Sequence, residues 1–220
     1  MKPPSPRINA LIAGTAYLVM AIIAVACLFD PKTVPIVAAA DAPWPDAVPA
    51  GLLKLVVGMG TIAGLDVVVA LALYGLFRRE APKVSAWMAG TRIVYALLFA
   101  LAISHAAAAY GVTRAGPADA AGVAAMLDAY GRFKGGWDFS FFVFAPHLAL
   151  LGWLVWDRSA LRKGLAILLG IAALGYFIDS VIAFAAPAIT FRLGIYTFVG
   201  ELTLIAWLFL QAGRRQTGSA

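Results

Sequence analysis

The stretch from residue 51 to residue 77 reads GLLKLVVGMGTIAGLDVVVALALYGLF, and Lys54 and Asp66 are its charged residues. A helix of about 20 mostly apolar residues crosses the hydrocarbon core of a bilayer. The stretch is longer than that, so it has room to tilt or to extend past the hydrocarbon. We predict a transmembrane helix here.

Five further stretches have the same character. The predicted spans are residues 10–29, 51–77, 84–109, 137–156, 165–186 and 193–212. Of the 220 residues 63% are hydrophobic and 13% are charged, where a soluble domain has about half and about a quarter. This composition excludes a soluble globular domain, a disordered chain and a coiled coil. It predicts an all-α bundle of six transmembrane helices, forming a single membrane domain over residues 1–220 in contact with the lipid bilayer.

Loop charges predict the orientation. With a cytoplasmic N-terminus, the inner segments hold Lys2, Arg7, Arg78, Arg79, Lys83, Arg158, Arg162, Lys163, Arg214 and Arg215. The outer segments then hold Lys32, Arg114, Arg132, Lys134 and Arg192. The inner excess favours both termini in the cytoplasm, in a multi-pass membrane protein. The net charge of +6 reflects this loop excess, so we expect no nucleic-acid partner.

The first span has an alternative interpretation. Lys2 and Arg7 precede it, and Val37-Ala38-Ala39-Ala40-Asp41-Ala42 resembles a small-residue cleavage site. A signal peptide usually has an apolar core of about 7–15 residues, and this one is longer. We therefore expect the first span to be retained, with cleavage as the alternative.

The segment between the third and fourth spans, residues 111–136, carries one apolar stripe. Val123, Met126, Leu127 and Tyr130 follow the spacing i, i+3, i+4, i+7 of a helix face. The stripe indicates a short helix lying on the outer membrane surface. The alternative is an ordinary connecting loop without a ligand role.

Ionisable residues occur where lipid is expected. Five spans each carry one near their middle, namely Asp66, Arg92, His147, Asp179 and Glu201. A rise of about 1.5 Å per residue places them between about 12 and 21 Å from the predicted cytoplasmic ends of their helices. Each such charge costs at least ~2.5–3.5 kcal/mol in a membrane span, so these side chains face the protein interior. We call them the polar belt.

The polar belt supports two interpretations. Its three acids and one arginine sum to −2 when the histidine is neutral, which a dry interior cannot hold. A belt that admits a proton, a cation or a small ligand resolves this charge imbalance. The most specific form of this hypothesis is that the protein transports what the belt binds. The alternative is an accessory or scaffolding subunit in which the belt only fixes helix packing, with Asp66 and Arg92 as a buried ion pair. The short turn joining their helices places these two at similar depth.

A second polar group, the outer rim, consists of Lys54, His105 and Asp138. Side chains near the membrane surface can reach water or headgroups, so the rim has low functional weight. In the second span Gly60 and Gly64 form a GxxxG pattern, which we interpret as close packing within the bundle.

Enzyme signatures are absent from the sequence. It has no HExxH, GxSxG or P-loop pattern, and no catalytic residue is predicted. Its two histidines differ in depth by more than ~15 Å, which disfavours a shared zinc or a bis-histidine haem. The one cysteine, Cys27, excludes an intrachain disulfide. The sequence identifies no metal or cofactor, and leaves open a homo-oligomer or a membrane partner subunit.

The region from His147 to Asp179 carries a family resemblance. Its motifs are Phe144-Ala145-Pro146-His147 with Gly152-Trp153-Leu154-Val155-Trp156, then Arg158-Ser159, and Gly175-Tyr176-Phe177-Ile178-Asp179-Ser180. Together with Leu71-Ala72-Leu73-Tyr74, Arg92 and Gly200-Glu201, this order resembles the bacterial membrane family catalogued as domain of unknown function 4386. The resemblance implies a six-helix membrane protein and no established activity. Family members often have proline after the Arg-Ser pair, where this chain has Arg162-Lys163.

Overall fold

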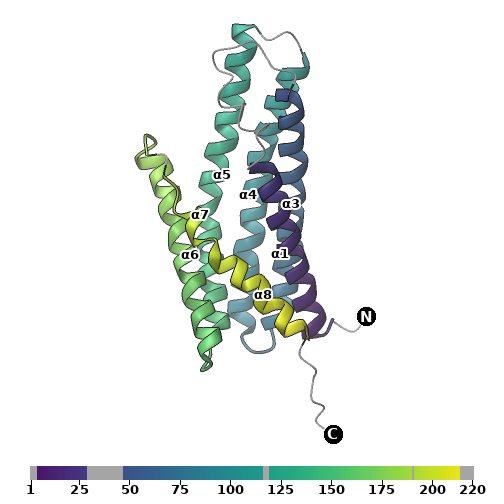
Figure 1. Ribbon diagram of the computed structural model, residues 1–220, viewed down its shortest axis with the longest axis vertical. Helices are drawn as coiled ribbons and strands as arrows, with labels where there is room; N and C mark the ends of the chain where they lie inside the picture. The colour runs from purple at the N-terminus through teal and green to yellow at the C-terminus, as the bar shows by residue number, and fades with distance from the viewer. Residues whose placement is uncertain (1–3, 29–46, 116–118, 190, 214–220) are drawn as a thin grey trace. The chain divides into compact units, whose positions relative to one another are not determined.

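A computed structural model describes residues 4–28, 47–115, 119–189 and 191–213. The helices are α1 (Pro6–Leu28), α3 (Ala47–Phe77), α4 (Pro82–Ala115), α5 (Ala120–Val155), α6 (Ala160–Ala185), α7 (Gly194–Thr197) and α8 (Val199–Gly213). No strand occurs in these ranges. Six helical segments are long and apolar enough to cross a membrane, with α7 and α8 together forming the sixth. The predicted all-α fold with six transmembrane helices is confirmed (Figure 1). The proposed cleavage site at residues 37–42 lies outside the described residues.

The helix ends follow from local sequence. Pro82 begins α4, where its missing N–H costs no hydrogen bond and its fixed φ favours a first turn. Ser159 caps α6, and its hydroxyl accepts a hydrogen bond from the backbone N–H of Arg162. The Arg162 side chain donates to the carbonyl of Val155 at the end of α5 and pairs with Asp157 at 2.8 Å. Arg162 thus stabilises this turn through its own side chain.

The expected short helix on the membrane surface is wrong, because this segment is part of a longer helix. Residues 120–136 are the first half of α5, a continuous helix of 36 residues. Met126 is fully buried beside Val48 of α3 and Ala109 of α4. The stripe therefore packs against protein, where the sequence suggested headgroups. At about 54 Å, α5 is longer than the hydrocarbon thickness of about 30 Å, so part of it extends beyond the hydrocarbon.

The chain divides into two compact units. One comprises residues 1–18, 66–95 and 141–220, and the other residues 19–65 and 96–140. In the first unit α8 packs on α6 (Figure 1), and Arg7 of α1 donates to the carbonyl of Ala212 in α8 at 3.0 Å. That contact places the start of α1 and the end of α8 together. A single functional domain over residues 1–220 stays a prediction.

Some glycines lie where two helices pack closely, and others lie on exposed helix faces. A Cβ on Gly200 would lie 2.7 Å from the carbonyl oxygen of Leu168, so α8 approaches the α6 backbone where only glycine fits. Gly60 and Gly64 are exposed, and a Cβ on either would meet nothing within 4 Å. The GxxxG pattern of α3 is therefore not a close-packing site within the bundle, contrary to the prediction. The prediction failed because a GxxxG pattern does not indicate whether its glycines face the neighbouring helices or the outside of the protein.

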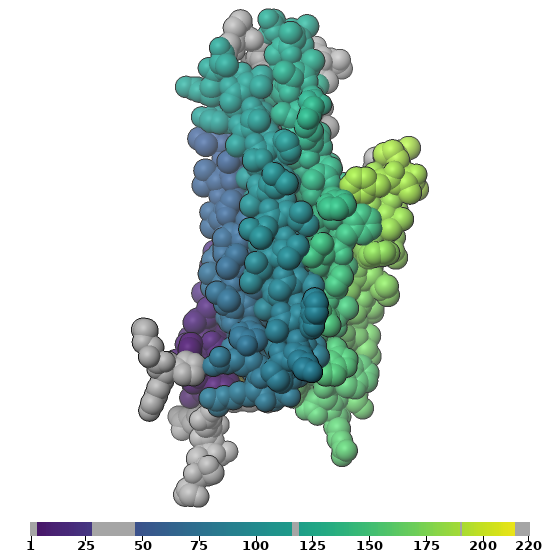
Figure 2. All heavy atoms as spheres, turned by 180° about the vertical axis from the view of Figure 1, so that it is seen from behind, coloured from purple at the N-terminus to yellow at the C-terminus, as the bar shows by residue number. Residues whose placement is uncertain are grey.

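Apolar side chains cover the outside of the helices. On α4 the exposed ones are Trp87, Val94, Leu97 and Leu101. Figure 2 shows this helix, in blue-teal, open along one face of the molecule. A soluble protein would hide such side chains, whereas lipid solvates them. The surface therefore agrees with a multi-pass membrane protein in contact with a bilayer.

Candidate functional site

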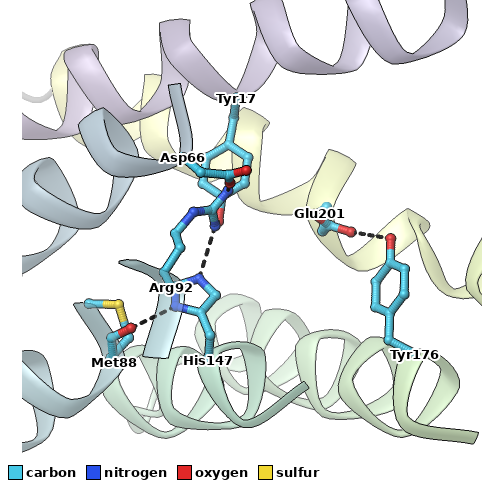
Figure 3. A network of polar contacts seen from close by, with 7 residues as sticks. All are labelled: Tyr17, Asp66, Met88, Arg92, His147, Tyr176 and Glu201. Atoms are coloured by element: carbon cyan, nitrogen blue, oxygen red, sulfur yellow. Dashed lines mark hydrogen bonds and ion pairs between the residues drawn. The ribbon is translucent and has the colours of Figure 1, made fainter. Parts of the chain in front are cut away.

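The centre of the site is Arg92 of α4, whose side chain is 1% exposed. Its guanidinium bonds to one side chain from each of three other helices (Figure 3). Nη2 lies 2.5 Å from Oδ1 of Asp66 in α3, and Nη1 lies 2.9 Å from Nε2 of His147 in α5. Nη1 also donates to the hydroxyl of Tyr17 in α1. The predicted buried ion pair of Asp66 and Arg92 is confirmed. We call these four residues the Arg92 site.

The contacts of His147 define its tautomer. Its Nδ1 lies 2.9 Å from the backbone carbonyl oxygen of Met88, which can only accept a hydrogen bond. Its Nε2 faces a guanidinium nitrogen of Arg92, which can only donate. The ring therefore carries its proton on Nδ1 and is neutral. A second proton on Nε2 would point at the N–H groups of Arg92.

Aromatic rings complete the surroundings of the guanidinium. Its Cζ lies 4.5 Å from the ring centroid of Tyr17 and 5.5 Å from that of Phe144. Cations are attracted to aromatic faces, most strongly where water is excluded. Tyr17 thus contacts Arg92 through both its ring and its hydroxyl, and both contacts stabilise the buried charge.

Two atoms of the ion pair have unused hydrogen-bonding capacity. Within the described residues, Nε of Arg92 and Oδ2 of Asp66 are buried and have no hydrogen-bond partner. One is a donor and the other an acceptor. Buried polar atoms are paired in the great majority of cases, so each exception needs an explanation. The Arg92 site thus offers one donor and one acceptor that its own side chains do not use.

Glu201 of α8 has a different partner. Its Oε1 accepts a hydrogen bond of 2.7 Å from the hydroxyl of Tyr176 in α6 (Figure 3). The ring of Tyr176 stacks on Phe141 at 4.8 Å between centroids and meets Phe144 edge-on at 5.3 Å. Phe144 also contacts Arg92 and His147. One aromatic ring therefore touches both the Arg92 site and the partner of Glu201.

Asp179 of α6 bonds to backbone. Its two carboxylate oxygens accept from the N–H groups of Leu193 and Gly194, each at 2.7 Å. These groups begin α7, whose N-cap residue has no side-chain cap of its own. Unpaired N–H groups at a helix start attract a carboxylate, so Asp179 acts as a cap supplied by another helix.

The structure therefore divides the predicted belt into three parts. It joins Asp66, Arg92 and His147, places Glu201 with Tyr176, and places Asp179 on backbone. The sequence analysis missed Tyr17, although a signal existed. Tyr17 is 11 residues beyond Pro6, the start of α1, so it lies about 17 Å along its helix, within the depth range of the belt.

The outer rim lies in the second unit. Lys54 is exposed, and His105 and Asp138 are half-buried. The backbone carbonyl of Lys54 is 3.7 Å from Sγ of Cys27. Among the described residues, no group of three or more His, Cys, Asp or Glu side chains is arranged to hold a metal ion.

The profile of the family described as domain of unknown function DUF4386 matches residues 12–212. The chain belongs to this family. An uncharacterised protein of the archaeon Archaeoglobus fulgidus is 34% identical over 163 residues, covering 73% of this chain and 84% of the relative. This relative is archaeal, whereas the resemblance had suggested a bacterial family. No solved structure matches the chain. These comparisons establish membership in the DUF4386 family and name no activity.

Proposed function

We propose that this DUF4386 protein binds a small polar ligand inside the membrane at the Arg92 site. The observation that carries the proposal is that Nε of Arg92 and Oδ2 of Asp66, which belong to one ion pair, are both buried without a hydrogen-bond partner. A purely structural network is expected to satisfy all of its members, because an unpaired buried polar atom costs about 1–3 kcal/mol. A ligand that accepts from Nε and donates to Oδ2 completes the site.

The net charge of the Arg92 site indicates which class of ligand it can bind. Arg92 and Asp66 together are neutral and His147 is neutral, so the site gains little by binding an ion. The attraction of a metal cation to Asp66 would be offset by its repulsion from Arg92, and the attraction of an anion to Arg92 by its repulsion from Asp66. The chemistry that fits is a neutral group with adjacent acceptor and donor atoms, such as a primary amide, a carboxylic acid or a hydroxyl. The most specific form of the proposal is that the protein moves such a ligand across the membrane.

Three small probes of similar size test this proposal. Acetamide offers both an acceptor and a donor, acetate only acceptors, and methylammonium only donors. We expect acetamide to raise the melting temperature of the purified protein in a saturable manner, because a ligand of the native state stabilises it. The control is the double variant Asp66→Leu with Arg92→Met, which removes the site without stranding a charge.

Acetamide should stabilise the wild type and leave the double variant unaffected, while acetate and methylammonium act alike on both proteins. An equal effect of acetamide on both proteins, or no effect on the wild type, would refute the proposal. The second result would favour the alternative, an accessory or scaffolding subunit in which the network only holds helices. The cap that Asp179 supplies to α7 is a purely structural use of one belt residue and supports that alternative.

We further propose a bacterial inner membrane as the location, with both termini in the cytoplasm. The positive charge of the predicted inner loops supports this orientation. Labelling of single cysteines introduced at Glu80 and Ala160 tests it. Both positions should react only with reagent that has access to the cytoplasmic side. A homo-oligomer or a membrane partner subunit stays part of the proposal.

A further inference from the structure

Glu201 differs from the other buried acids in its partners. Asp66 faces a guanidinium and Asp179 faces backbone N–H groups, but the carboxyl group of Glu201 bonds to the hydroxyl of Tyr176. Among the described residues, no Lys, Arg or His lies within ion-pair distance of this carboxyl group. Glu201 is buried, with 7% of its surface exposed.

The hydroxyl of Tyr176 suits both protonation states of a carboxyl group. It donates its hydrogen to a carboxylate oxygen, and its oxygen accepts from the O–H of a carboxylic acid. The 2.7 Å contact to Oε1 is therefore retained whether or not Glu201 carries a proton. The rings of Phe141 and Phe144 pack on Tyr176 and hold its hydroxyl in place. A guanidinium partner, in contrast, would bind the carboxylate alone.

Titratable groups on neighbouring helices surround this pair. They are Arg92 and Tyr95 from α4, Asp66 from α3, Tyr17 from α1 and Asp179 from α6, and the two tyrosines among them are neutral. Arg92 and Asp66 form an ion pair with each other, so their opposite charges largely cancel at the position of Glu201. The immediate partner of Glu201 thus remains the neutral hydroxyl.

We infer that Glu201 is a proton-exchanging site within the membrane, with Tyr176 as the hydrogen-bond partner of both states. On protonation, hydronium gives its proton to the carboxylate, which leaves water and the neutral acid, and on release the acid returns the proton to water. This site is separate from the proposed ligand at Arg92, with which it shares the contacts of Phe144.

The composition of the chain makes a direct test possible. Its two glutamates are Glu201 and Glu80, and Glu80 is exposed. The full chain is labelled with ¹³C at the glutamate side-chain carboxyl and reconstituted in phosphatidylcholine vesicles. In the variant Glu80→Gln the remaining signal belongs to Glu201. Glu201→Gln is the matched variant that retains only Glu80, and it identifies the second signal.

We expect the Glu201 signal to change between its acid and carboxylate forms within the pH range over which the protein stays folded. Tyr176→Phe should raise the midpoint of this transition by about one pH unit, because the lost hydrogen bond stabilises the charged carboxylate more than the neutral acid. A signal that stays in one form throughout that range in Glu80→Gln would overturn the inference, and this result does not depend on Tyr176→Phe folding. An unchanged midpoint in Tyr176→Phe would overturn the role of Tyr176. Neither result bears on acetamide binding at Arg92.

Discussion

Replacing Arg92 by methionine is the most informative perturbation of this protein. Both members of the Asp66–Arg92 pair have side chains that are 1% exposed, and their atoms are 2.5 Å apart. Arg92→Met keeps a long apolar side chain but leaves the Asp66 carboxylate without its cation. It also removes the donor to Tyr17 and His147.

The magnitude follows from these contacts. Stranding one charge of a buried pair costs about 3–5 kcal/mol, and leaving a buried acceptor such as Nε2 of His147 unpaired adds about 1–3 kcal/mol. The double variant Asp66→Leu with Arg92→Met suffers only the second loss, because no charge remains. We therefore expect the double variant to be more stable than Arg92→Met by about 3 kcal/mol, or about 100-fold in the folding equilibrium.

The assay is equilibrium unfolding of purified protein in mixed micelles, followed by circular dichroism for the wild type, both single variants and the double variant. The coupling free energy from this cycle isolates the pair from its neighbours. If the destabilisations of Asp66→Leu and Arg92→Met simply add in the double variant, the two residues are not energetic partners. The reasoning from burial and distance would then fail.

Three further predictions address other contacts. Asp179→Ala should destabilise the protein by about 2 kcal/mol and accelerate amide exchange at the start of α7, because two N–H groups lose their cap. Gly200→Ala should cost about 1–3 kcal/mol in thermal unfolding, because its Cβ would lie 2.7 Å from a carbonyl oxygen of α6, whereas the control Gly60→Ala meets nothing within 4 Å. ¹⁵N shifts of labelled histidine should show His147 as the neutral Nδ1–H tautomer near pH 7, and a charged ring would contradict the assigned contacts.

The Asp66–Arg92 pair illustrates what sequence reasoning can reach. The two residues flank a short turn at similar distances, so antiparallel geometry alone predicts their contact, and the structure confirms it. Tyr17 was missed because its helix is far from Arg92 along the chain. Helix depth indicates which residues share a level of the membrane, but not which way their side chains point around each helix.

The sequence by itself determined the six apolar helices, their approximate limits except the start of α5, and the need to satisfy buried charges, because lipid leaves a spanning backbone few alternatives. Tertiary structure alone decided which partner satisfies each charge. Asp179 caps α7, Glu201 bonds to Tyr176, and residues 120–136 continue α5 against α3 and α4. The reason is that hydropathy depends on composition within one segment, whereas hydrogen bonds depend on helix rotation and close approach, as at Gly200, where α8 meets the backbone of α6.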